Sequence, residues 1–148
     1  MSGSALQLEY SIEAEVTAEF AWKYRTDIAN WNDPPAQFVL DGAFVAGSRG
    51  TTVLPGQQPL HWKIREVQSP SSFIIEMELD REILTFEWRF DASSAHTTTM
   101  TQKIVLAGEN AAAYAEQVRA GFSPALADGM RRIAAEMEAA QKRFTSAG

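Results

Sequence analysis

The sequence predicts an α+β fold in which a curved antiparallel sheet of about six to seven strands wraps around a long C-terminal helix, with short helices after the first strand. Three observations support this class: apolar–polar alternation near the N-terminus, two central strands whose apolar residues match across a tight turn, and an amphipathic C-terminal stripe. The order strand, helix, strands, helix is typical of helices gathered on one face of an antiparallel sheet. The 148 residues suit one domain spanning residues 1–148.

The first predicted strand covers residues 6–16, where apolar and polar side chains alternate without a break. A period of two over eleven residues indicates a strand with one buried face. Thr17 then offers a hydroxyl as N-cap, and apolar residues at helical spacing predict a helix that runs to Trp31. Pro34 and Pro35 end this helix, because proline lacks the amide hydrogen.

Two short strands follow, at residues 37–41 and 51–54, and glycines surround them. Glycines in such numbers favour turns and sharp bends over a flat sheet. The pairing of these strands is left open. Four residues before these strands are expected to border the mouth of any pocket, although their ordinary role is capping and turn formation. They are Asp27, Asn30, Trp31 and Asn32.

The central strands allow a register prediction that does not depend on residue propensity. If Leu79 faces Glu82 across the Asp80-Arg81 turn, every apolar residue of the two strands falls on one face. The predicted inward pairs are Met77 with Leu84, Ile75 with Phe86, and Phe73 with Trp88.

The preceding strand, which begins at Leu60, is predicted by extending the same register backwards. Ile64 then lies opposite Met77, Arg65 opposite Glu76 and Lys63 opposite Glu78, while Glu66 points inward near the strand end. The final strand, residues 97–106, is predicted to place alternate residues on the inner face. These residues are Thr98, Met100, Gln102, Ile104 and Leu106.

The C-terminal region is predicted to begin with an alanine-rich segment at residues 111–120, either a short helix or a helical lead-in before Gly121. A helix then restarts and covers residues 124–144. Ser123 as N-cap and Pro124 at the first helical position are a sound start for the second helix. One apolar stripe marks its buried face. The stripe comprises Leu126, Met130, Ile133, Met137, Ala140 and Phe144.

Composition narrows the classes of function. There are no cysteines, which excludes thiol catalysis and thiolate metal sites, and no metal or cofactor is expected. The net charge of −6 and the lack of a basic stripe argue against a nucleic acid partner. No window of the sequence approaches the roughly 20 apolar residues of a membrane span, so the cytoplasm is the expected location. The expected oligomeric state is a monomer or a homodimer.

The chain resembles the START-like or Bet v 1-like helix-grip superfamily (SRPBCC), and within it the polyketide cyclase/dehydrase and lipid-transport group. The resemblance covers nearly the whole chain and rests on element order and spacing. Its landmarks are the opening strand into residues 17–22, the Trp31 region, the glycine pattern from Gly47 to Gly56, residues 60–64 before Ser69-Pro70, and the C-terminal helix. It implies a deep cavity for a small hydrophobic ligand between the sheet and the terminal helix.

The candidate ligand-binding residues are inward-facing groups of the predicted strands and of the helix opposite. Each aromatic among them is more often a core residue, whereas an amide such as Gln102 among apolar neighbours needs a polar partner. The candidates are Tyr10, Trp62, Phe86, Trp88, Met100, Gln102, Phe122, Leu126 and Met130. No catalytic residue is assigned.

Three functions remain open at this point. The preferred hypothesis is a carrier or sensor that binds a lipid, polyketide-like or aromatic metabolite. The first alternative is a cofactor-independent cyclase or dehydratase in which a Tyr, Glu or Arg moves protons, with Tyr10 and Glu66 as residues to test. The second is a protein-interaction domain like the Hsp90 activators of the same fold, which would need a large apolar surface patch.

Overall fold

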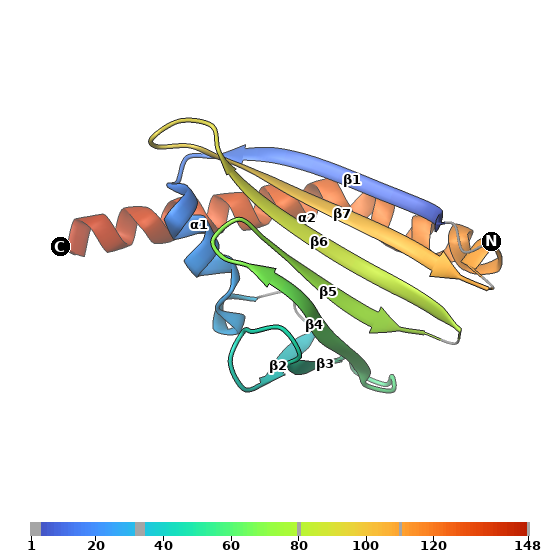
Figure 1. Ribbon diagram of the computed structural model, residues 1–148. Helices are drawn as coiled ribbons and strands as arrows, with labels where there is room; N and C mark the ends of the chain where they lie inside the picture. Colours follow the sequence, from blue (N-terminus) through green and yellow to red (C-terminus); the bar gives the residue numbers. More distant parts are fainter. Residues whose placement is uncertain (1–3, 32–34, 80, 110, 148) are drawn as a thin grey trace.

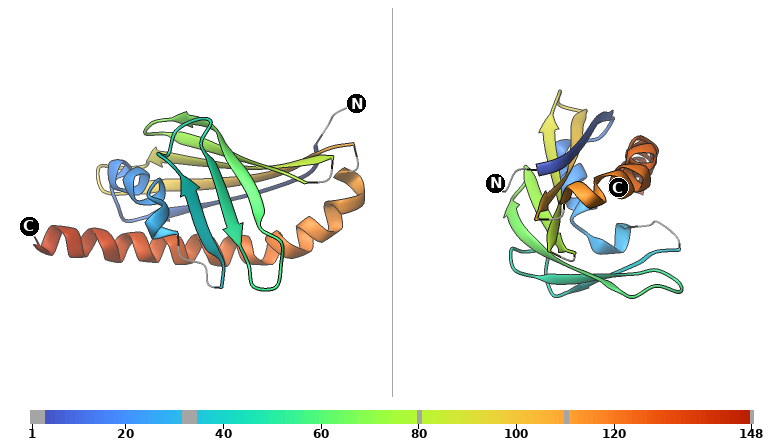
Figure 2. Two further views of the ribbon diagram at one scale, coloured as in Figure 1. Left: turned by 90° about the horizontal axis from the view of Figure 1, so that it is seen from below. Right: turned by 90° about the vertical axis from the view of Figure 1, so that its right-hand side faces the viewer.

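A computed structural model of the protein describes residues 4–31, 35–79, 81–109 and 111–147. Seven strands form one antiparallel sheet in the order β1-β7-β6-β5-β4-β3-β2 (Figure 1). This sheet curls around the C-terminal helix α2, as the end-on view of Figure 2 shows. The elements are β1 (Ser4–Ala14), α1 (Ala18–Arg25), the 3₁₀ helix η1 (Ile28–Asn30), β2 (Gln37–Asp41), β3 (Arg49–Val53), β4 (Leu60–Gln68), β5 (Ser72–Glu78), β6 (Glu82–Ala92), β7 (Thr98–Gly108) and α2 (Ala111–Ala147).

The N-terminal strand and its helix follow the predicted pattern. Leu6 and Ala14 of β1 are buried, and the intervening glutamates are exposed. The Thr17 hydroxyl accepts a hydrogen bond of 3.1 Å from the Phe20 amide, which confirms the N-cap. The helix ends at Arg25 instead of reaching Trp31, because the Asp27 carboxylate accepts from the Ala29 amide and starts the separate turn η1.

The β5–β6 hairpin has the predicted register. Met77 pairs with Leu84, Ile75 with Phe86, and Phe73 with Trp88. The Leu79 amide donates to the Glu82 carbonyl at 2.8 Å, and Arg81 has φ 69°, as a tight hairpin turn requires. These paired apolar residues therefore share the inner face of the sheet, whereas Ile74 and Ile83, which pair with Glu87 and Glu78, lie on the outer face.

The predicted register of β4 against β5 is wrong. Trp62, and not Ile64, lies opposite Met77, while Lys63 lies opposite Glu76. Two features account for this two-residue difference: the strands pair up to Gln68 and Ser72, which leaves a three-residue turn, and a bulge at Arg65 adds one more residue of shift. The bulge lets Ile64 and Val67 both face the core. Glu66 consequently pairs with Ile74, whose neighbours Phe73 and Ile75 face inward, so Glu66 lies on the outer face and not on the predicted inner one.

The pairing that the sequence left open is resolved at the far edge of the sheet. β2 pairs with β3, and β3 pairs with β4, so that Gly50 lies directly opposite Trp62. A Cβ atom on Gly50 would lie 2.2 Å from the Trp62 ring. The Trp62 indole can therefore lie across β3 because Gly50 has no side chain.

The C-terminal helix is one helix and not two, which corrects the predicted break before Ser123. A proline removes one backbone hydrogen bond and bends a helix without having to end it. The bend is visible in the N-terminal third of α2, drawn in orange in the left view of Figure 2. The described residues contain no helix long and apolar enough to cross a membrane.

The predicted stripe of α2 faces the sheet. Met130 and Met137 are fully buried, Leu126 and Ile133 pack against the core, and the Phe144 side chain lies outside the described residues. The helix is also tied to the end of β1, where the amide of Glu15 donates to Glu138 Oε2 at 2.8 Å and that of Thr17 donates to Gln141 Oε1 at 3.0 Å.

Candidate functional site

A cavity of about 400 Å³ lies between the inner face of the sheet and α2. Its walls are mostly apolar. The sheet contributes Phe38, Thr52, Leu60, Trp62, Ile75, Met77, Phe86, Trp88, Gln102 and Ile104; α2 contributes Phe122, Ala125, Leu126, Gly129, Arg132, Ile133 and Glu136; the segments around α1 and β3 contribute Tyr24, Arg25, Asn30, Trp31, Ala36 and Leu54.

The cavity exists because the helix is thin where it passes the centre of the curved sheet. Ala125 and Gly129 occupy the helix wall, and a Cβ built on Gly129 meets no atom within 4 Å. Large side chains of the same helix lie on either side of these two small residues in the sequence. Phe122 contacts Phe86 edge to face with 5.7 Å between ring centroids, and Met130 fills the core behind the cavity.

Six of the predicted ligand-binding residues lie in the cavity wall. They are Trp62, Phe86, Trp88, Gln102, Phe122 and Leu126. Gln102 is the polar exception among apolar neighbours of the sheet, and it lies opposite Trp88 on β6. Contact between these residues and a ligand stays a prediction.

Tyr10, Met100 and Met130, the other three candidates, are not among the lining residues. Met100 and Met130 are fully buried in the main hydrophobic cluster, and Tyr10 packs against the same cluster from β1. The physical reason is that α2 packs along β1 and β7, which fills the space in front of these residues with side chains. The alternation of apolar and polar residues in the strands predicts which residues face inward. It does not predict where open space separates the helix from the sheet.

The polar groups of the cavity come mainly from helices, and most of them were missed in the sequence. The exceptions are Gln102 of β7 and Asn30 and Trp31 near the predicted mouth. Tyr24 and Arg25 end α1, while Arg132 and Glu136 lie one turn apart on α2. Their only sequence signal was helical spacing, since Arg132 and Glu136 follow Ala125 and Gly129 on one side of the helix. Asn32, also predicted near the mouth, lies outside the described residues.

Four planar side chains form a stack, here called the tryptophan–arginine column. The Arg25 guanidinium carbon lies 4.3 Å from the ring centroid of Trp88 and 4.7 Å from that of Trp31. Trp31 in turn stacks on Trp62 with 5.6 Å between centroids and 28° between ring planes. All four residues line the cavity, although they come from four separate segments of the chain.

Hydrogen bonds hold this column in place. The Trp31 indole N–H donates to the backbone carbonyl of Arg25 at 2.7 Å, and the Trp62 indole N–H donates to Thr52 Oγ1 at 3.0 Å. Each bond satisfies the polar atom of an indole that is buried or half-buried in the cavity wall.

Tyr24, which lines the cavity, has a shifted pKa. Burial raises the pKa of its phenol above the ordinary value, and the negative charge of Glu136 raises it further, while Arg143 and Arg25 act in the opposite direction. The phenol thus keeps its proton at neutral pH. It can donate a hydrogen bond to a molecule in the cavity.

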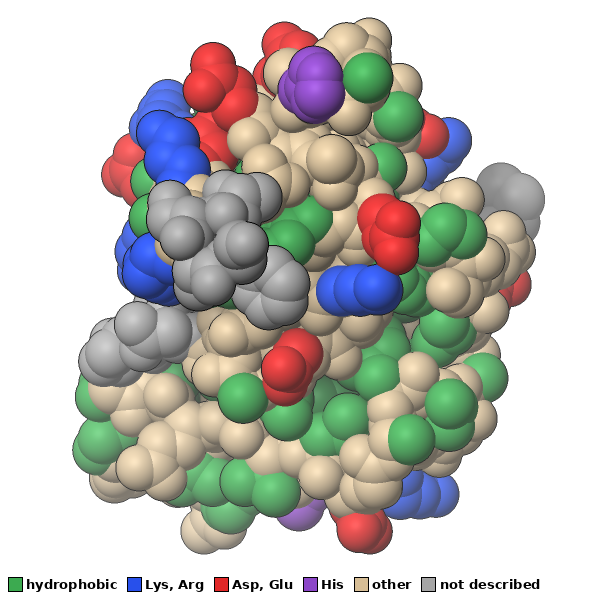
Figure 3. All heavy atoms as spheres, turned by 90° about the vertical axis from the view of Figure 1, so that its left-hand side faces the viewer, with side chains coloured by type: hydrophobic (Ala, Val, Ile, Leu, Met, Phe, Trp, Pro, Cys, Tyr) green, Lys and Arg blue, Asp and Glu red, His purple; other side chains and the backbone are tan. Residues whose placement is uncertain are grey.

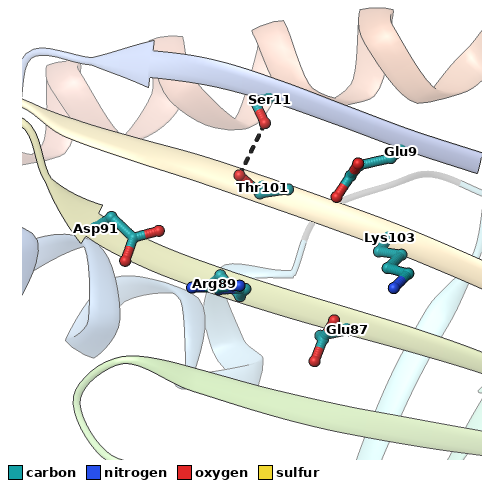
Figure 4. A pocket seen from close by; sticks show the side chains of 7 residues that line it. All are labelled: Glu9, Ser11, Glu87, Arg89, Asp91, Thr101 and Lys103. Atoms are coloured by element: carbon teal, nitrogen blue, oxygen red, sulfur yellow. Dashed lines mark hydrogen bonds between the residues drawn. The ribbon is translucent and has the colours of Figure 1, made fainter.

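A second hollow, of about 300 Å³, lies on the outer face of β1, β7 and β6 and is drawn in Figure 4. Its lining is polar and follows the strand pairing. Lys103 lies opposite Glu9 on one side and Glu87 on the other, and Ser11 Oγ lies 2.8 Å from Thr101 Oγ1. Such cross-strand pairs of opposite charge are the ordinary means by which an exposed sheet face is stabilised.

Comparison with known proteins places the chain in a family. The family described as polyketide cyclase / dehydrase and lipid transport matches residues 5–138. The chain therefore belongs to this family, and its fold is the helix-grip fold of the Bet v 1-like proteins. No curated protein matches the sequence.

Solved structures share this fold at low sequence identity. A norcoclaurine synthase mutant from Thalictrum flavum, in complex with a transition state analogue, superposes with a TM-score of 0.75 at 9% identity, covering 96% of this chain and 98% of the other. The Zhui aromatase/cyclase from Streptomyces sp. R1128 gives 0.71 at 12% identity, with 90% and 93% covered. Protein Ms6760 from Mycobacterium smegmatis gives 0.63 at 16% identity, with 97% and 98% covered.

Proposed function

We propose that the protein binds a small hydrophobic molecule in the cavity between the sheet and α2, and acts as its carrier or sensor. The observation that supports this most directly is a cavity of about 400 Å³ with mostly apolar walls and a few polar groups. Small-molecule sites have this size and this composition. The family supports a role in ligand binding or cyclisation. We expect the protein to work in the cytoplasm as a single domain, monomeric or homodimeric.

The ligand itself is best sought in the native host. Native mass spectrometry of protein purified from that host should show an organic molecule that leaves on denaturation. A lipid, a polyketide-like compound or an aromatic metabolite would each agree with the proposal. Purification in complex with another protein, with no small molecule bound, would contradict it.

Filling the cavity should abolish binding without harming the fold. Gly129→Phe places an aromatic ring in open space, because a Cβ at this position meets no atom within 4 Å. Replacing a helical glycine also favours the helix by up to about 1 kcal/mol. We expect at least a tenfold loss of affinity for the neutral probe N-phenyl-1-naphthylamine, measured by fluorescence titration.

The matched control is Gly121→Phe on the same helix. A Cβ on Gly121 also meets no atom within 4 Å, but this residue is exposed and is not part of the cavity wall. The control should bind the probe as tightly as the unmodified protein does. Equal binding by all three proteins would show that the probe does not enter the cavity and would count against the proposed site.

A cyclase or dehydratase is the second candidate, and Tyr24 with Glu136 is the observation that favours it. Both residues line the cavity, and the Tyr24 phenol, whose pKa is raised by burial and by Glu136, stays protonated and can donate a hydrogen bond to a bound carbonyl. Tyr10 and Glu66, the groups predicted for this chemistry, are less suitable, since Tyr10 is outside the lining and Glu66 lies on the outer face.

The enzyme hypothesis predicts that Tyr24→Phe lowers turnover of a poly-β-ketone substrate by about 10²-fold or more, as loss of an acid–base group does. Affinity for N-phenyl-1-naphthylamine should stay the same, because the aromatic ring is retained. Tyr114→Phe is a suitable control, since Tyr114 is exposed and is not part of the cavity wall. Unchanged turnover in Tyr24→Phe would exclude a role of Tyr24 in the reaction, and no turnover by the unmodified protein would argue for a carrier instead.

The protein-interaction alternative has weaker support. Among the described residues, the large hydrophobic side chains most exposed to solvent are Val39 and Val45, on β2 and in the loop that follows it. Figure 3 shows hydrophobic side chains in the lower part of this end of the molecule, where β2 and β3 lie. They are interrupted by polar atoms, whereas partner surfaces are usually contiguous. We therefore do not propose this function.

A further inference from the structure

We infer that the ligand is a planar heterocycle with a hydrogen-bond donor and an acceptor side by side, as in an aromatic lactam, and that this pair binds the side-chain amide of Gln102. The inference rests on the proposed function, because it names the class of molecule that the same cavity would take. Gln102 is then the residue that determines specificity. Its position, its lack of a hydrogen-bond partner and the aromatic wall around it support this role.

Gln102 lies on the inner face of the sheet, on the strand between β1 and β6. Its neighbours in the sequence, Thr101 and Lys103, line the hollow on the outer face, whereas Gln102 lines the cavity (Figure 4). Met100 and Ile104, the next inward residues along β7, are fully buried, but Gln102 is only half-buried. The surface that Gln102 keeps accessible therefore belongs to the cavity.

The amide of Gln102 forms no hydrogen bond with any of the described residues, and neither its oxygen nor its nitrogen is closed off from the cavity. Polar side chains lie opposite it on both neighbouring strands, Tyr10 on β1 and Trp88 on β6, yet neither bonds to it. A polar group among apolar neighbours needs a partner, which is water or a ligand. A ligand that displaces the water has to replace its hydrogen bonds.

A lactam satisfies both parts of a primary amide at once. Its carbonyl accepts from the amide N–H, while its own N–H donates to the amide carbonyl. The pairing does not depend on how the amide is turned, because exchanging its oxygen and nitrogen only reverses the direction of the lactam. A ketone or an ester can accept but not donate, so either would leave the amide oxygen unsatisfied.

The wall around Gln102 is suited to a flat ring system. Six aromatic rings besides Tyr24 line the cavity, and two of them, Trp31 and Trp62, stack with 28° between their planes. Another, Trp88, lies directly opposite Gln102 in the sheet. Offset stacking and edge contacts with such rings stabilise an aromatic ligand beyond the simple burial of its surface. The six lining residues are Trp31, Phe38, Trp62, Phe86, Trp88 and Phe122.

Two uncharged probes of the same shape test the inference. 2-Quinolone and coumarin share one bicyclic skeleton with one carbonyl group, and they differ only in the ring atom beside that carbonyl, which is N–H in the first and oxygen in the second. Isothermal titration calorimetry at pH 7 therefore isolates the contribution of the donor. We expect the unmodified protein to bind 2-quinolone at least tenfold more tightly, because coumarin would set its ring oxygen against the amide oxygen.

The outcomes separate this inference from the proposed function. Equal affinities for 2-quinolone and coumarin would overturn the inference and leave the proposed function intact. Binding of neither by a protein that still binds N-phenyl-1-naphthylamine would have the same meaning. No binding of any of the three probes would contradict both the inference and the proposed function.

Gln102→Met should remove the preference, so that coumarin binds at least as tightly as 2-quinolone, while affinity for coumarin does not fall. Methionine is unbranched like glutamine but lacks the amide. Gln7→Met is the matched control, because Gln7 is exposed on β1 and is not part of the cavity wall. It should keep the full preference. Retention of the preference in Gln102→Met would overturn the assignment of Gln102.

Thermal melting followed by circular dichroism distinguishes recognition from a structural role of Gln102. The substitution breaks no hydrogen bond within the described residues and removes a polar group from apolar surroundings, so Gln102→Met should melt at the same temperature as the unmodified protein or higher. A variant that melts at a lower temperature and binds neither probe would show that the amide stabilises the sheet, which would contradict the inference.

Discussion

Met137→Asp will prevent the protein from folding into a cooperative native state. Met137 is fully buried at the centre of the α2 stripe, among the residues of the main hydrophobic cluster. The substitution loses about 1.5–3 kcal/mol of burial and adds the several kcal/mol that an unpaired buried charge costs. The sum approaches the total stability of a typical domain, about 5–15 kcal/mol. Thermal melting followed by circular dichroism should show no sharp transition.

The control for this substitution is Ala135→Asp, an exposed position two residues earlier on the same helix. It introduces the same charge and the same loss of helix propensity, and it should melt within a few degrees of the unmodified protein. Ile133, a stripe residue by its spacing, is a less decisive site because it lines the cavity and is only half-buried. Cooperative melting of Met137→Asp would show that α2 does not pack on the sheet as described.

Gly50→Val will displace Trp62 and disrupt the tryptophan–arginine column. A Cβ on Gly50 would lie 2.2 to 2.5 Å from three atoms of the Trp62 ring. The indole is buried, stacked on Trp31 and hydrogen-bonded to Thr52, so it has no room to yield without losing these contacts. Overpacking costs about 1–3 kcal/mol, and the lost hydrogen bond costs about 1 kcal/mol more.

The expected result for Gly50→Val is a lower urea midpoint together with at least a tenfold loss of affinity for N-phenyl-1-naphthylamine. Thr51→Val is the matched control: the β-branched side chain is similar, and Thr51 lies opposite His61 on the outer side of the same strand. It should bind N-phenyl-1-naphthylamine normally. Unaltered binding by Gly50→Val would mean that Trp62 does not contribute to the ligand site.

Local patterns predicted much of this fold. The alternation of β1, the Thr17 cap and the β5–β6 register follow from residues close together in the chain, and all three are confirmed. The position of the turn determines which residues of a hairpin face the core, because a register shift of one residue would bury the charged residues of the outer face.

The wrong predictions concern features that depend on contacts between segments distant in the sequence. The sequence predicted a uniform register for β4, but the bulge at Arg65 depends on keeping Ile64 and Val67 both in the core. It predicted a helix break before Ser123, but packing along β1 and β7 supports one bent helix. Residue propensity and apolar spacing contain no information about these long-range contacts, which favour the bulge in β4 and the continuous helix α2.

The sequence by itself determined the class of the fold, the inward residues of most strands and the apolar face of the terminal helix, because each of these is a periodic property of a short segment. Only the tertiary structure decided which inward residues face open space and which, like Met100 and Met130, are core. It alone brought Arg25 between Trp31 and Trp88. Such a stack depends on the relative positions of α1, the segment after η1 and β6, and those positions follow from the packing of the whole chain.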